Sequence, residues 1–114
     1  KVYVLLSDGE LDEGSNWEAI MFAGHHKVNN LIAIVDKNGF QGYSATEKVL
    51  NLSPLKKKIE VFGWEVKECD GHDFKSIKTV FGQRQSLIKP LMIIANTVKG
   101  KGISYFEGKL VNFF

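Results

Sequence analysis

At residues 31–39 the chain reads Leu31-Ile32-Ala33-Ile34-Val35-Asp36-Lys37-Asn38-Gly39. The apolar first half is short and rich in strand formers, and the polar second half is typical of a turn, so this stretch predicts a strand buried on both faces. Val2–Leu6 (VYVLL), ended by Ser7-Asp8-Gly9, and Leu91–Ala95 (LMIIA) have the same character. Such strands are typical of a parallel sheet covered on both sides.

Helical patterns separate these strands. Ser15 and Glu18 have the spacing of a capping box, in which each side chain binds an N–H group at the start of a helix. The apolar face expected for this helix consists of Trp17, Ile20, Met21, Gly24 and Val28. The small Gly24 would permit close packing of this helix on its neighbours.

The alternation continues along the chain. Ser53 and Pro54 predict the start of a second helix, and Gly63 predicts its end. Residues 64–69 alternate like a partly exposed strand, and Asp73 predicts the N-cap of a third helix before the last strand. The order β-α-β-α-β-α-β predicts an α/β fold, a parallel sheet with helices on both faces.

The composition fits one globular domain. The 114 residues are 44% hydrophobic and 25% charged, with a formal net charge of +2, which gives little support for nucleic-acid binding. No apolar run approaches the ~20 residues of a membrane span. The single cysteine, Cys69, suits a reducing cytosol, so we expect a cytoplasmic protein. Because Lys1 opens directly into a strand-like run, we expect residues 1–114 to be a single partial domain of a longer protein.

Polar residues follow every predicted strand. Asp8, Asn38, Asp70 and Thr97 would gather on one edge of a parallel sheet, where ligands bind. If the first two strands are neighbours, the Asp8 carboxylate and the Asn38 amide oxygen can face one Mg²⁺ ion, with the Phe40 carbonyl as a third ligand. Turn formation alone would explain the same residue types, since Asp, Asn and Gly favour turns.

Other acidic arrangements are also considered. A calcium loop starting at Asp8 fails, because its twelfth position is Ala19 where a glutamate is required. A receiver-like phosphorylation switch could use Asp8 and Asp36 as its acids, with Thr97 and Lys99 after the last strand. It would leave the helix start described above unexplained.

A longer stretch is more specific. Residues 7–19 (SDGELDEGSNWEA) resemble the thiamine diphosphate fingerprint of transketolases, GDG-x-x-x-EG-x-x-WEA. The resemblance continues, in order, through Asn30–Asn38 (NLIAIVDKN), Phe62–Val66 (FGWEV), Asp70–Asp73 (DGHD) and Lys99–Ser104 (KGKGIS). Gln41-Gly42-Tyr43 and Thr46-Glu47 are most similar to the small amino-terminal subunit of split, two-chain transketolases.

The resemblance implies a cofactor site. Asp8, Asn38 and the Phe40 carbonyl would bind Mg²⁺ (or Ca²⁺), which holds the diphosphate of thiamine diphosphate. The Gly9 N–H would contact that diphosphate, and Glu10 beside it would belong to the same cofactor-binding site. These roles are expectations from the family.

The resemblance also implies an activity and partners. Transketolases move a two-carbon ketol unit from a ketose, such as a sugar phosphate, to an aldose, and the cofactor supplies the electron sink. The glutamate that activates the aminopyrimidine belongs to another domain, a separate chain in split enzymes. We therefore expect no catalytic residue here and no turnover by the isolated chain. Glu13 is similar to the family's dimer-interface glutamate, so we also expect a homo-oligomer.

Two departures leave the function open. Ser7 replaces the first glycine of the fingerprint, and the family's upstream segment does not precede Val2 in this sequence. The alternative to a working transketolase subunit is a truncated, catalytically inactive module that binds the cofactor or a partner. We also expect a sheet without upstream neighbours to show a bare edge or an apolar face.

Overall fold

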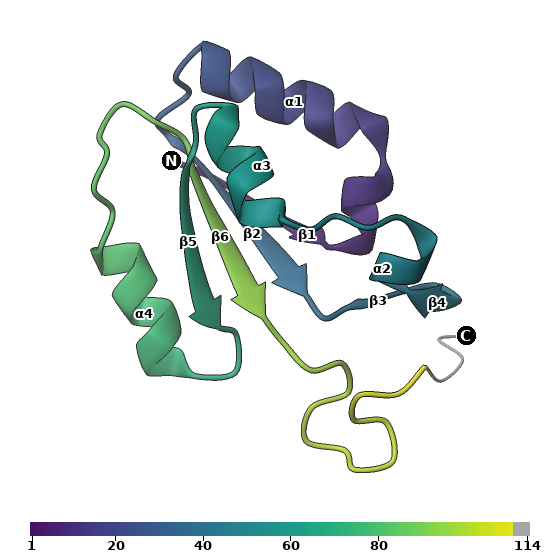
Figure 1. Cartoon of the computed structure of the whole chain (residues 1–114). Coiled ribbons are helices and arrows are strands. Elements are labelled where there is room, and N and C mark those ends of the chain that lie inside the picture. Colours follow the sequence, from purple (N-terminus) through teal and green to yellow (C-terminus); the bar gives the residue numbers. More distant parts are fainter. Residues whose placement is uncertain (111–114) are drawn as a thin grey trace.

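A computed structural model describes residues 1–110 and shows one four-stranded sheet (Figure 1). The spatial order is β1-β2-β6-β5, and all three neighbouring pairs are parallel. The strands span Val2–Ser7 (β1), Leu31–Lys37 (β2), Glu65–Asp70 (β5) and Leu91–Asn96 (β6). The parallel α/β fold predicted from the alternating pattern is therefore confirmed, and β1 and β2 are neighbours.

Helices cover both faces of the sheet (Figure 1). The helices and the small hairpin are η1 (Gly9–Asp12), α1 (Gly14–His25), β3 (Phe40–Gln41), β4 (Ser44–Ala45), α2 (Thr46–Val49), α3 (Leu55–Val61) and α4 (Phe74–Gly82). Helices α1 and α3 pack with Val35 and Met92 in one core, whereas α4 packs with Ile32 and Ile93 in the other. Successive residues of β2 and β6 thus enter opposite cores, as the pleat of a strand requires. Among residues 1–110, none of the helices is long and apolar enough to cross a membrane.

Strand β1 differs from its prediction. Tyr3 is 57% exposed and Leu5 is 70% exposed, so the strand is not buried on both faces. The physical reason is its position: within the described residues β1 pairs only with β2, and α4 lies toward the other end of the sheet. The expected bare, apolar edge is therefore present at β1.

The predicted capping box is wrong. Helix α1 begins at Gly14 with Glu13 as its N-cap, and Glu13 makes no side-chain capping bond. The preceding η1 turn orders this start instead, because Asn16 Nδ2 donates to the Glu10 carbonyl (2.6 Å) and Trp17 Nε1 donates to the Leu11 carbonyl (2.7 Å).

The other two helix starts divide. Pro54 is itself the N-cap of α3 and Ser53 does not cap it, contrary to prediction. Asp73 caps α4 as predicted, since its carboxylate accepts the N–H groups of Lys75 and Ser76. Gly63, with φ at +92°, follows the end of α3 where a glycine was expected.

The close packing expected at Gly24 is present. A Cβ atom at this position would lie 1.8 Å from the Phe62 carbonyl oxygen, so α1 and the end of α3 touch through backbone atoms. Trp64 Nε1 also donates to the Ile20 carbonyl at 2.8 Å. Met21 is 53% exposed, so it does not belong to the apolar face predicted for α1.

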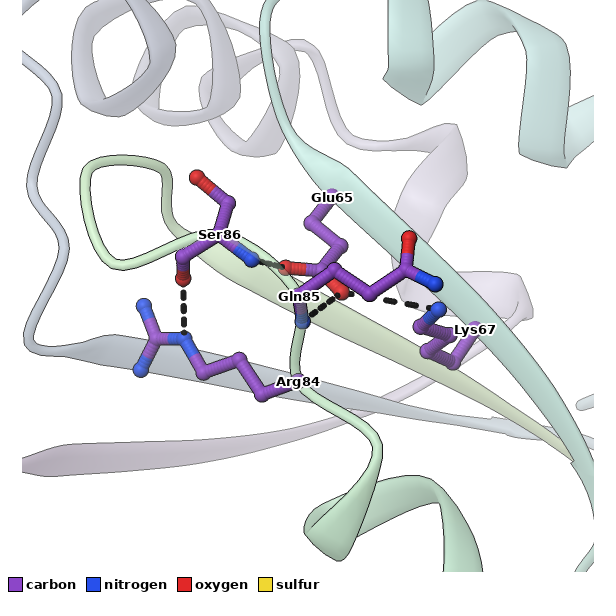
Figure 2. A network of polar contacts seen from close by, with 5 residues as sticks. All are labelled: Glu65, Lys67, Arg84, Gln85 and Ser86. Atoms are coloured by element: carbon purple, nitrogen blue, oxygen red, sulfur yellow. Dashed lines mark hydrogen bonds and ion pairs between the residues drawn. The ribbon is translucent and has the colours of Figure 1, made fainter.

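A polar network holds the loop between α4 and β6 (Figure 2). The Glu65 carboxylate accepts the N–H groups of Gln85 and Ser86 (both 2.7 Å) and pairs with Lys67 at 3.5 Å. Arg84 donates to the carbonyls of Ser86, Asn29 and Lys89. Burial raises the pKa of Glu65, but the two N–H donors and Lys67 outweigh it, so the pKa lies below its usual value of 4.5.

We predict that Glu65→Gln lowers the free energy of unfolding by about 1–2 kcal/mol at pH 7, since a charged acceptor of two backbone bonds is lost. A lowered folded-state pKa stabilises the protein above pH 4.5, and that contribution is lost as the pH falls through the folded-state pKa. The difference between wild type and variant, measured by urea unfolding, should therefore shrink between pH 5 and about pH 3. Glu60→Gln, on the exposed side of α3, is the control. A difference that does not vary with pH would contradict this assignment.

Candidate cation and diphosphate site

The carboxyl ends of β1 and β2 bring two turns together. Ser7 lies opposite Asp36 in the parallel register, and the Asp8 N–H donates to the Asp36 carbonyl at 3.1 Å. The turn that starts at Asp8 therefore lies beside the turn that contains Asn38 and Gly39, although about 30 residues separate them in the chain.

The Asp8 carboxylate links these turns. Its Oδ2 accepts the Gly39 N–H at 2.8 Å, and its Oδ1 accepts the Gly9 N–H at 3.0 Å. The side-chain oxygen of Asn38 accepts the Phe40 N–H at 2.9 Å, which folds the second turn around the same point. The carboxylate thus bonds the peptide unit that lies between Asn38 and Phe40, the other residues expected to bind a cation.

Burial sets the electrostatics of Asp8. The residue is only 3% exposed, and this burial is the main reason that its pKa is raised above the usual 3.8. The N–H groups of Gly39 and Gly9 and the Thr46 side chain lower the pKa, whereas the charge of Asp36 raises it further. A divalent cation would relieve both unfavourable effects, because it neutralises a desolvated carboxylate.

A cavity of about 350 Å³ opens at Asp8. Its walls come from the ends of β2 and β4, from α2 and from the segment before α3, and they include Gly39, Phe40 and Thr46. The Oγ1 atom of Thr46 is buried there and forms no hydrogen bond of standard geometry. A polar, partly enclosed cavity beside a buried carboxylate fits a hydrated cation and the phosphate groups bound to it.

The remaining predicted residues surround this point in different ways. A Cβ atom at Gly9 would lie 2.7 Å from the Cβ of Gln41, so close approach of β3 already requires glycine there. Glu10 is exposed, and its carboxylate accepts the Ser7 N–H at 2.6 Å, which closes the η1 turn. Glu13 is exposed at the start of α1.

The two other strand-end residues also lie on this edge, but farther along it. Thr97 donates through Oγ1 to the Asp36 carboxylate, and its N–H donates to the Lys37 carbonyl at 3.1 Å. Asp70 ends β5, on the far side of β6, where its carboxylate accepts the His72 N–H at 2.8 Å. The predicted gathering on one edge is thus real, although only the turns after β1 and β2 meet at Asp8.

Sequence reasoning assigned Thr46 no role in this site. The β3–β4 hairpin carries it back to Gly39, whose carbonyl accepts the Thr46 N–H at 2.9 Å. No spacing rule foretells this return, because the hairpin strands are two residues long. Within residues 1–110 no group of three His, Cys, Asp or Glu side chains could hold a metal, so a cation here would depend on amide, carbonyl and phosphate oxygens as well.

Comparison with known proteins places this geometry. The family model described as "Transketolase, thiamine diphosphate binding domain" matches residues 1–111. One chain of the two-part apulose-4-phosphate transketolase of Actinobacillus succinogenes is 50% identical over 109 residues, which cover 96% of this chain and 40% of the relative. The 6-deoxy-6-sulfo-D-fructose transketolase subunit SqwG of Clostridium sp. is 44% identical over 112 residues, which cover 97% of this chain and 41% of the relative.

Longer transketolases are also similar. Human transketolase is 41% identical over 109 residues, which cover 96% of this chain and 17% of the relative. The crystal structure of Campylobacter jejuni transketolase superposes with a TM-score of 0.87 at 36% identity, over 96% of this chain and 17% of that one. These matches leave the receiver-like interpretation without support. The chain spans well under half the length of these relatives, and it belongs to the transketolase family, in its thiamine diphosphate-binding domain.

Proposed function

We propose that this chain supplies the cation- and diphosphate-binding part of a transketolase-type enzyme. The observation that carries the proposal is the buried Asp8 carboxylate, which joins the turns after β1 and β2 and faces the 350 Å³ cavity. Several relatives are named as individual subunits of transketolases, which supports a separate pyrimidine-binding partner chain.

The proposed ligands of Mg²⁺ (or Ca²⁺) are the Asp8 carboxylate, the Asn38 side-chain oxygen and the Phe40 carbonyl. Each Asp8 oxygen and the Asn38 oxygen accepts one N–H donor, which leaves a second lone pair on each for the cation. The Gly9 N–H would turn from Asp8 toward the cofactor's diphosphate, and the exposed Glu10 would flank the same phosphate groups.

The bound cofactor would supply the electron sink for transfer of a two-carbon ketol unit from a ketose, such as a sugar phosphate, to an aldose. This chain would position the diphosphate, and the pyrimidine-binding partner would supply the activating glutamate. Glu13, exposed before α1, would lie at the interface between chains in a cytoplasmic oligomer. No catalytic residue is proposed within the chain, so ketol transfer is expected only with the partner present.

Calorimetry tests the proposal. Thiamine diphosphate titrated into the chain should bind with Mg²⁺ or Ca²⁺ present and lose affinity when EDTA removes the cation. Asp70→Asn, which alters a carboxylate on the same sheet edge but away from Asp8, should leave this binding unchanged. Absence of binding with either cation at millimolar cofactor would contradict the proposal and favour the inactive-module alternative.

A further inference from the structure

Thr46 has a buried hydroxyl without a well-formed hydrogen bond. The residue is only 5% exposed, and its Oγ1 atom has no hydrogen-bond partner of standard geometry. Buried hydroxyl groups in folded proteins are nearly always hydrogen-bonded, because leaving one unpaired costs free energy. An orphaned hydroxyl in a cavity therefore points to a partner that the cation-free chain does not provide.

The backbone holds Thr46 against the Asp8 carboxylate. The Gly39 peptide unit receives the Thr46 N–H at its carbonyl (2.9 Å) and donates its own N–H to Asp8 Oδ2 (2.8 Å). Both side chains border the same 350 Å³ cavity. Gln41 has a second buried, unpaired donor, its Nε2 atom, but Gln41 is not part of that cavity wall.

Asp8 can accept one more donor when a cation binds. Its two oxygens each accept one backbone N–H, and a carboxylate has about four lone-pair positions in total. One free position would serve the cation and another a hydroxyl. Carboxylates that bind metals are usually hydrogen-bonded by such outer partners, which set the direction of the metal-facing lone pair.

We propose that Thr46 is a positioning residue of the cation site, whose hydroxyl donates to the Asp8 carboxylate when a divalent cation is bound and holds it in the binding orientation. The proposal rests on the proposed function, since it requires that a cation binds at Asp8. The β-branched side chain suits this role, because threonine has fewer χ1 rotamers than serine.

The test uses Thr46→Val, which keeps the shape and removes the hydroxyl, and Thr46→Ser, which keeps the hydroxyl. Mg²⁺ is titrated into each full chain at a constant millimolar concentration of thiamine diphosphate. Thr46→Val should weaken Mg²⁺ binding by about 10–100-fold, and Thr46→Ser should restore most of it. Thr79→Val is the matched control, since it removes a threonine hydroxyl on α4 that bonds the Lys75 carbonyl.

Thermal unfolding without cation supplies a second readout. Because the Thr46 hydroxyl has no well-formed hydrogen bond there, Thr46→Val should leave the melting temperature unchanged or raise it. A lowered melting temperature would show that the hydroxyl bonds within the cation-free fold, which would overturn the proposal. Unchanged Mg²⁺ affinity in Thr46→Val would also overturn it.

Failure of the inference is distinct from failure of the proposed function. If wild type binds Mg²⁺ and Asp8→Ala does not, the cation site stands, and the Thr46 variants decide the inference alone. If wild type and Asp8→Ala behave alike, no cation binds at Asp8 and both proposals are overturned.

Discussion

Replacing Asp8 with alanine should abolish the Mg²⁺ dependence of thiamine diphosphate binding. Asp8 is the sole charged group among the three proposed ligands, and its burial, at 3% exposure, leaves little water to compensate for its loss. The loss in Mg²⁺ affinity should exceed the ~10–100-fold expected when an outer partner is removed. Isothermal calorimetry of Mg²⁺ into the chain with cofactor present measures it. Retained Mg²⁺ affinity would place the cation elsewhere.

Asp8→Asn separates charge from shape. Burial raises the pKa of Asp8, so the folded chain favours the protonated acid, and above pH 3.8 the ionised carboxylate progressively lowers stability when no cation is present. The amide should therefore fold at least as stably at pH 7, although one of the two backbone bonds to Gly39 and Gly9 is lost. Millimolar Mg²⁺ with cofactor should raise the melting temperature of wild type and leave that of Asp8→Asn unchanged. An equal rise in both would contradict the assigned role.

Gly24→Ala should be the most destabilising single methyl group that can be added to the helical layer. Its Cβ would lie 1.8 Å from the Phe62 carbonyl oxygen and 2.9 Å from the carbonyl carbon, and backbone atoms cannot rotate away as a side chain can. Helix α1 must move off the end of α3, which opens the core that contains Ile20 and Ile59. We expect a loss of about 3–5 kcal/mol in the free energy of unfolding, at the high end for overpacking.

Gly82→Ala is the matched control for this prediction. Gly82 ends α4, and an added Cβ would meet nothing within 4 Å. Alanine there should stabilise the helix by up to about 1 kcal/mol, because it restricts the unfolded chain and favours helix. Urea unfolding of both variants checks the pair. Similar effects at the two glycines would mean that α1 and α3 are not in backbone contact.

The fold was predictable because local signals agreed with one another. The apolar runs at residues 31–35 and 91–95 became central strands, and Asp73 capped the helix that it precedes. The burial of β1 was not predictable, since residues 2–6 read the same whether their strand is central or at an edge. Neighbouring strands, and not composition, decide which case applies.

Helix starts show a similar limit. Ser15 and Glu18 match the capping-box spacing, but the chain enters α1 through the η1 turn, which moves the helix start upstream to Gly14. Side-chain bonds from Asn16 and Trp17 back to that turn replace the expected caps. Such contacts depend on the path of the preceding loop, which residue spacing does not reveal.

The site divides between what order along the chain determines and what the hairpin determines. Asp8 and Asn38 could be placed together because turns after neighbouring parallel strands share one edge. Thr46 could not, because the β3–β4 hairpin sets its position beside Asp8. The dependence of cation affinity on Asn38 and Phe40 remains a prediction.

Anomalous diffraction from Mn²⁺, used in place of Mg²⁺ in crystals grown with thiamine diphosphate, tests the central claim most directly. The account predicts one anomalous peak within about 2.5 Å of the Asp8 carboxylate, the Asn38 side-chain oxygen and the Phe40 carbonyl, with diphosphate oxygens completing an octahedron. A peak bound elsewhere, or bound cofactor without a cation at Asp8, would contradict it.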